Sequence, residues 1–196
     1  GGFEIAVNDG GPDPDLQLNA KLTDASLRLQ EETNAVVENV TATLTAMSKD
    51  VSLKGGGTVA SAELDVPTAK VTDMSAYNAH FPPSSPIRII NGAADLSARI
   101  AMAPGTASGF AKLKTSRIEA DIDGKRISGV VGVDAKIVGG SAETRTFEID
   151  GSAVTLDGLR VAGSETGNWG ARIDIGKGKV IWKRPMTLDA STTFSM

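Results

Sequence analysis

Apolar and polar residues alternate along most of this chain, with the two-residue period that places apolar side chains on one face of a β-strand. The longest strict alternation covers residues 94–102. Similar runs recur from one end of the sequence to the other, at residues 16–22, 40–46, 62–66, 118–122, 131–137, 169–175 and 188–194. The pattern predicts an all-β protein whose sheet has one apolar and one polar face.

Short turn sequences separate the alternating runs. Asp123-Gly124 and Pro104-Gly105 are two of them, and Asp-Gly favours a tight hairpin because both residues tolerate positive φ. Further turns are predicted at residues 8–11, 55–57, 139–140, 157–158 and 176–178. Alternating runs joined by tight turns predict strands that follow one another in an antiparallel meander.

One segment departs from the strand pattern and predicts a short helix near residues 74–80. Thr72 or Asp73 can act as its N-cap, because both side chains accept hydrogen bonds from the first turn. Pro82 follows and ends it. Three apolar residues are spaced for one helical face: Met74, Tyr77 and Phe81. We expect this face to pack on the sheet.

Large side chains are scarce on the predicted strands. Hydrophobic residues make up 40% of the chain but aromatic residues only 4%, whereas a filled sandwich draws on more bulky residues. The expected fold is all-β, a long antiparallel meander curled into an open groove or an elongated two-layer sandwich. We expect residues 1–196 to form a single domain, a fragment of a longer protein, because both ends of the chain fall within strand patterns.

Charge and composition exclude several kinds of function. The formal net charge is −4, and the chain has no run of basic residues, so no nucleic-acid partner is expected. The absence of cysteine excludes disulfides, thiol catalysis and cysteine-based zinc sites. The single histidine, His80, has no predicted catalytic partner, and there is no G-x-S-x-G nucleophile turn. We therefore expect neither an enzyme, nor a metal site, nor a cofactor.

Two small sets of residues have alternative interpretations. Asp9, Asp13 and Asp15 offer oxygen ligands for calcium, but they lack the EF-hand spacing, and a solvated loop is favoured. Trp169 and Trp182 are candidates for stacking on sugar rings. Both fall in the apolar phase of neighbouring residues, which favours a role in the core.

The segment 71–100 resembles a recurrent piece of the AsmA-like group of Gram-negative envelope proteins, which includes TamB. In that group a strand ends in an acidic residue, followed by a short helix with an asparagine before a proline; here these are Asp73, Asn78 and Pro82. A strand then leads to a glycine, here Gly92, and to alternating residues.

A second piece, at residues 154–180, is similar to another recurrent part of these proteins. Leu156, Leu159 and Val161 form a strand of the L-x-x-L-x-V kind, which leads to the pair Trp169-Gly170 and a further strand. The resemblance covers about residues 60–196, and the alternation extends it over the whole chain.

The resemblance implies a sheet curled into a trough, called a β-taco, with an apolar concave face. It implies a periplasmic location, a parent protein anchored in the inner membrane, and phospholipid or another acyl-chain lipid as partner. Flanking segments of the same longer chain and outer-membrane assembly proteins are further implied partners. The residues expected to line the groove are Leu96, Ala98, Ile100, Ile118, Ala120, Ile122, Val131, Val133, Ala135, Ile137, Ala171, Ile173 and Ile175.

Two other functions fit an all-β chain of this kind. A structural or assembly scaffold for outer-membrane biogenesis predicts a filled interior and protein partners, and the lack of a fixed repeat period disfavours a solenoid form of it. A carbohydrate-binding β-sandwich predicts an exposed aromatic platform, for which the chain has few residues.

Overall fold

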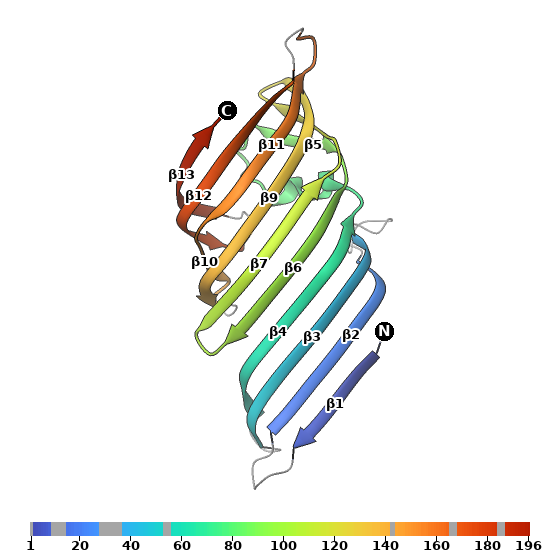
Figure 1. Cartoon of the computed structure of the whole chain (residues 1–196), viewed down its shortest axis with the longest axis vertical. Coiled ribbons are helices and arrows are strands. Elements are labelled where there is room, and N and C mark those ends of the chain that lie inside the picture. The colour runs from blue at the N-terminus through green and yellow to red at the C-terminus, as the bar shows by residue number, and fades with distance from the viewer. Residues whose placement is uncertain are drawn as a thin grey trace.

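The computed structural model describes residues 2–8, 15–27, 37–52, 56–141, 144–164, 168–183 and 187–196. In these ranges thirteen strands form one antiparallel sheet, accompanied by one short 3-10 helix, η1 (Met74–His80) (Figure 1). The strands are β1 (Gly2–Asn8), β2 (Asp15–Leu27), β3 (Val37–Ser52), β4 (Gly56–Val71), β5 (Ile87–Asn91), β6 (Ala94–Ala103), β7 (Thr106–Thr115), β8 (Ile118–Ile122), β9 (Lys125–Ser141), β10 (Thr146–Ile149), β11 (Ser152–Val161), β12 (Trp169–Ile181) and β13 (Thr187–Ser195). The predicted all-β, antiparallel architecture is confirmed.

The strands follow one another across the sheet in chain order. Successive pairings run from β1 through β2, β3 and β4 to β6, β7 and β9, and β13 pairs with β12 at the far side. Three pairs of consecutive strands lie end to end and act as single strands with a break: β5 with β6, β7 with β8, and β10 with β11. The chain is therefore an up-and-down meander.

Four strands, β9, β10, β12 and β11, form a small closed ring of pairings. Both β10 and β11 pair with β9 on one side and with β12 on the other. The registers continue from one half to the other, since Ile149 pairs with Ile137 and Ala153 with Asp134. The ring thus encloses the break at Asp150-Gly151.

Two of the predicted turns are confirmed in detail. Asp123 and Gly124, with φ of 51° and 76°, connect β8 to β9, which is the positive-φ pair that a tight hairpin requires. Gly105, with φ of 74°, follows Pro104 between β6 and β7. The turn predicted at 8–11 lies outside the described part of the chain, apart from Asn8 at the end of β1. Of the turn predicted at 55–57, Gly56 and Gly57 belong to β4, and residue 55 lies outside the described part.

Three other predicted turns are wrong. Residues 139–140 lie inside β9, 157–158 inside β11 and 176–178 inside β12. Each coincides with a shift in strand register instead. Glycine marks both turns and β-bulges because both need unusual φ values, as Gly158 shows with φ of 58°.

The strand breaks near η1 line up across the sheet. Gly92-Ala93 separates β5 from β6, and Ser116-Arg117 separates β7 from β8; the Ser116 N–H donates to the Ala93 carbonyl at 2.9 Å. In the next strand, the Val131 N–H donates to the Thr115 hydroxyl at 2.7 Å. Buried residues collect along this line: Val71, Ile89, Ala94, Thr115, Ala120 and Leu159. One packed core therefore lies beside the helix. A second group of buried residues lies in the ring of β9, β10, β11 and β12: Ile149, Ser152, Ala153 and Ala171.

Helix η1 lies behind the sheet in the view of Figure 1 and packs on this core. Its N-cap is Asp73, whose carboxylate accepts from the Ser75 N–H at 2.8 Å. Met74 and Tyr77 pack against a buried cluster made by Val37, Ala69, Val71 and Ala94. The predicted helix and the predicted role of these two side chains are confirmed, whereas Phe81 is the half-buried C-cap residue.

Candidate apolar binding face

The strand registers place the alternating apolar residues of the whole sheet on one face, named here the apolar face. Directly paired residues of antiparallel strands point to the same side of a sheet. Leu64 on β4 pairs with Ile100 on β6, which pairs with Gly109 on β7. The row continues in both directions and crosses nine strands: Ala20, Leu44, Leu64, Ile100, Gly109, Ile137, Ile149, Gly178 and Ala190.

A second row runs beside the first, nearer to η1. It contains larger side chains and crosses β6, β7, β9, β11, β12 and β13: Leu96, Leu113, Val133, Val154, Ile173 and Phe194. Between the two rows lie the small side chains of Ala98, Ala111 and Ala135, which pair in sequence on β6, β7 and β9. A strip of methyl groups therefore lies between a row of large side chains and a row in which Ile100 and Ile137 flank Gly109.

The predicted lining residues all lie on the apolar face. Two of them, Ala120 and Ala171, are buried near η1 and the strand breaks, and the other eleven are half-buried. Sequence reasoning missed β7, whose inward positions are small except for Leu113, and it missed Val154 on β11. The two-residue spacing of Ala107, Gly109, Ala111 and Leu113 could have predicted β7.

Much of the apolar face remains in contact with solvent. Leu22 on β2 is 52% exposed and Phe194 on β13 is 60% exposed. All described strands belong to one sheet, and η1 is the only other element in the described ranges that packs on this face. Helix η1 covers one end of the face, beside β4 and β6, and burial raises the pKa of Tyr77 there.

The opposite face carries the polar and charged residues. Salt bridges join Arg99 to Glu63 at 2.7 Å and Lys112 to Asp134 at 3.5 Å, both between neighbouring strands and both well exposed. Exposed pairs of this kind contribute little stability, about 0–1 kcal/mol each. The polar face thus carries exposed ion pairs, but it also holds the buried Ala153 and a hollow of about 590 Å³ lined by residues of β4, β6, β7, β9, β11 and β12.

The two tryptophans do not form part of the core. Trp169 is 39% exposed and Trp182 is 59% exposed, so the core interpretation is wrong. Trp169 begins β12 and Trp182 directly follows that strand, so they lie about 40 Å apart at roughly 3.3 Å per residue. This separation keeps them from forming one aromatic platform.

In the described ranges no three His, Cys, Asp or Glu side chains gather as metal ligands. No helix in that part of the chain is long and apolar enough to cross a membrane. Asp9 and Asp13 lie outside the described residues, as does the side chain of His80.

Comparison of the chain with protein-family models, with curated proteins and with solved structures finds no match. The resemblance to AsmA-like envelope proteins therefore stays a prediction, and function has to be argued from the two faces of the sheet.

Proposed function

We propose that this chain is a non-enzymatic segment of an envelope protein whose sheet curls into an open groove of the β-taco kind. In this proposal the apolar face binds phospholipid acyl chains in the periplasm and conducts them between the inner and outer membranes. The observation that supports it is the unbroken set of apolar rows that crosses the sheet while large side chains on it stay exposed.

The physical basis is removal of hydrocarbon from water. Each CH₂ group buried contributes about 0.8 kcal/mol, and a face of aliphatic side chains offers this along its full length. Such a surface makes no directional hydrogen bonds, so an acyl chain bound to it can slide. Over the small side chains of Ala98, Ala111 and Ala135 an acyl chain can approach the backbone more closely than over the neighbouring leucine and isoleucine side chains.

The test compares two substitutions on the same strand. Ala98 and Ala101 are both half-buried on β6, but Ala98 lies on the apolar face and Ala101 on the polar face, opposite Glu63. Protein purified without detergent is examined by native mass spectrometry and lipid extraction. We expect Ala98→Lys to lose bound phospholipid and Ala101→Lys to retain it. Lipid-free wild-type protein, or equal lipid content in the two variants, would exclude acyl-chain binding on this face.

An assembly scaffold is the second candidate, favoured by the two open sheet edges. In the described ranges, β1 pairs only with β2, and β13 only with β12. Unpaired strand edges can recruit another strand. This function predicts lipid-free protein that forms complexes with outer-membrane assembly proteins, and these complexes would be lost on substituting proline into β13.

A further inference from the structure

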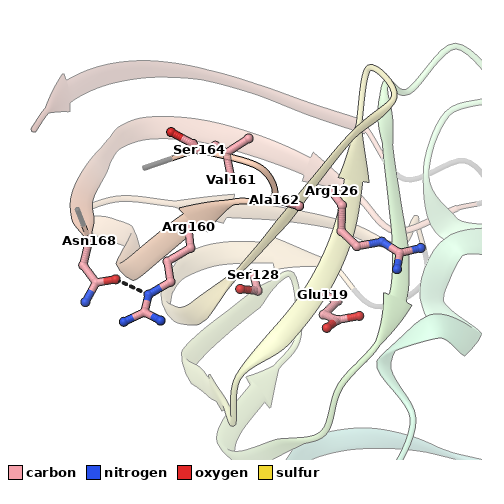
Figure 2. A pocket seen from close by; sticks show the side chains of 8 residues that line it. All are labelled: Glu119, Arg126, Ser128, Arg160, Val161, Ala162, Ser164 and Asn168. Carbon is pink, nitrogen blue, oxygen red and sulfur yellow. Dashed lines mark hydrogen bonds between the residues drawn. The ribbon is translucent and has the colours of Figure 1, made fainter. Parts of the chain in front are cut away.

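The polar face has a hollow at the end of the sheet, where β8, β9 and β11 meet (Figure 2). Its volume is about 500 Å³. Ser128 lies at its centre, on the polar side of β9, since it pairs directly with Glu119 on β8 and Arg160 on β11. The lining residues are Glu119, Arg126, Ser128, Arg160, Val161, Ala162, Ser164 and Asn168.

Three arginines are neighbours of Ser128. Arg126 precedes it by two residues on β9, Arg160 pairs with it from β11, and Arg117, from the break between β7 and β8, donates to its hydroxyl at 3.2 Å. In Figure 2 the guanidinium groups of Arg126 and Arg160 extend to opposite sides, away from Ser128. Arg126 is exposed, so its terminal group can turn toward a ligand above Ser128. The hollow thus combines guanidinium groups with a hydroxyl group that Arg117 holds.

The carboxylates nearby have other partners. Glu119 accepts from the Asn91 side chain at 3.1 Å. Asp121 pairs in register with Arg126, but its carboxylate accepts from the Gly124 N–H at 2.8 Å in the hairpin turn. In the described part of the chain, none of the three arginines forms a salt bridge, whereas Arg99, Lys112 and Arg172 on the same face do. Glu119 and Asp121 keep their negative charges, so the three arginines and these two carboxylates together leave an excess of one positive charge, although the chain carries −4 overall.

Arg160 is also held in place. Its Nε donates to the Asn168 side-chain oxygen across the end of the sheet. This bond uses one edge of the guanidinium and leaves its terminal nitrogens as donors. A guanidinium fixed at Nε presents a planar pair of N–H groups, the geometry that binds two oxygens of one phosphate.

We propose that this hollow binds a phosphate group, with Arg126 and Arg160 as the charged ligands and the Ser128 hydroxyl as a neutral one. The group belongs to a lipid headgroup or to free phosphate; both present tetrahedral oxyanions that guanidinium forks recognise. The site lies on the polar face and does not depend on acyl-chain binding to the apolar face.

The test measures binding of inorganic phosphate by isothermal titration calorimetry and, separately, binding to vesicles of phosphatidylglycerol and of phosphatidylcholine. The variants are Arg126→Gln with Arg160→Gln, and Arg126→Lys with Arg160→Lys, which keeps the charge but not the fork. The control is Arg172→Gln, an arginine of the same face that is already paired with Asp174. Circular dichroism confirms that each variant is folded.

Phosphate binding that falls at least tenfold in the glutamine variant, and less in the lysine variant, identifies a free-phosphate site. Binding to phosphatidylglycerol vesicles, but not to free phosphate or to phosphatidylcholine vesicles, identifies a headgroup site if it depends on the two arginines in the same way. Binding in neither arm would overturn the proposal. So would binding that the Arg172→Gln control reduces as much as the double glutamine variant does.

Discussion

At the scale of single residues, Asn78 links the helix to the sheet by imitating a strand. Its side-chain oxygen accepts from the Ile89 N–H and its amide donates to the Ile89 carbonyl, both at 2.8 Å. Both backbone groups belong to β5, and a neighbouring strand would satisfy them in the same way. This gives a physical reason for an asparagine at position 78, because aspartate cannot donate and a longer side chain would displace the helix.

Removing the Asn78 side chain should therefore weaken the fold. We expect Asn78→Ala to lower the free energy of unfolding by about 1–3 kcal/mol, since two part-buried backbone groups lose their partners. Asn78→Asp should also lower it, because a carboxylate oxygen would then face the Ile89 carbonyl oxygen in place of the amide donor. Urea denaturation measures both, with Asn91→Ala, at an exposed side-chain contact with Glu119, as the control. If Asn91→Ala is as destabilising as Asn78→Ala, the paired bonds to Ile89 have no special role.

At the scale of elements, the alternation predicted eight strands, and each of them coincides with a strand of the structure. The N-cap residues and the spacing of three apolar side chains predicted η1 at Met74–His80. The alternating runs did not include β1, β5, β7, β10 or β11. In β7, small residues on the apolar face weaken the contrast between faces. The sequence pattern also took the bulges in β9, β11 and β12 for turns. Glycine permits both a turn and a bulge, and the choice depends on pairing with strands distant in sequence.

Gly92 tests the importance of the break between β5 and β6. Its φ is 138°, and a Cβ placed there would lie 2.3 Å from Cγ2 of Ile118. Gly92→Ala should lower the melting temperature, because strained backbone alone costs about 1–3 kcal/mol and the clash adds to it. The control is Gly105→Ala, which also has positive φ but whose Cβ would meet nothing within 4 Å. Differential scanning calorimetry that finds equal effects would show that the approach of Ile118 does not matter.

At the scale of the whole molecule, the sheet is two-sided. The sequence indicated that each strand has an apolar side, but it did not show that all these sides coincide in continuous rows. That coincidence depends on the registers of strands separated by breaks and bulges, which local patterns do not determine. For the same reason the arginines around Ser128 were not predicted, since they come from positions 117, 126 and 160.

An exposed apolar face should make stability depend on amphiphiles. A ligand that binds only the folded state stabilises it by mass action, by about 2.7 kcal/mol at a hundredfold excess over its Kd. We expect a lysophospholipid below its micellar concentration to raise the melting temperature of the wild type and of Ala101→Lys, but not of Ala98→Lys. If the lysophospholipid raises or lowers the melting temperature of all three proteins equally, it acts as a general detergent.

The shared phase of the strands also constrains how this chain can change in length during evolution. One residue inserted within a paired strand would exchange the two faces for the rest of that strand, carrying charge into the apolar rows. An insertion at a bulge or break, such as Asp150-Gly151 or Gly176-Lys177, is absorbed locally without this exchange. Homologous chains should therefore differ in length at these points and in the hairpins, and keep the residue count between them.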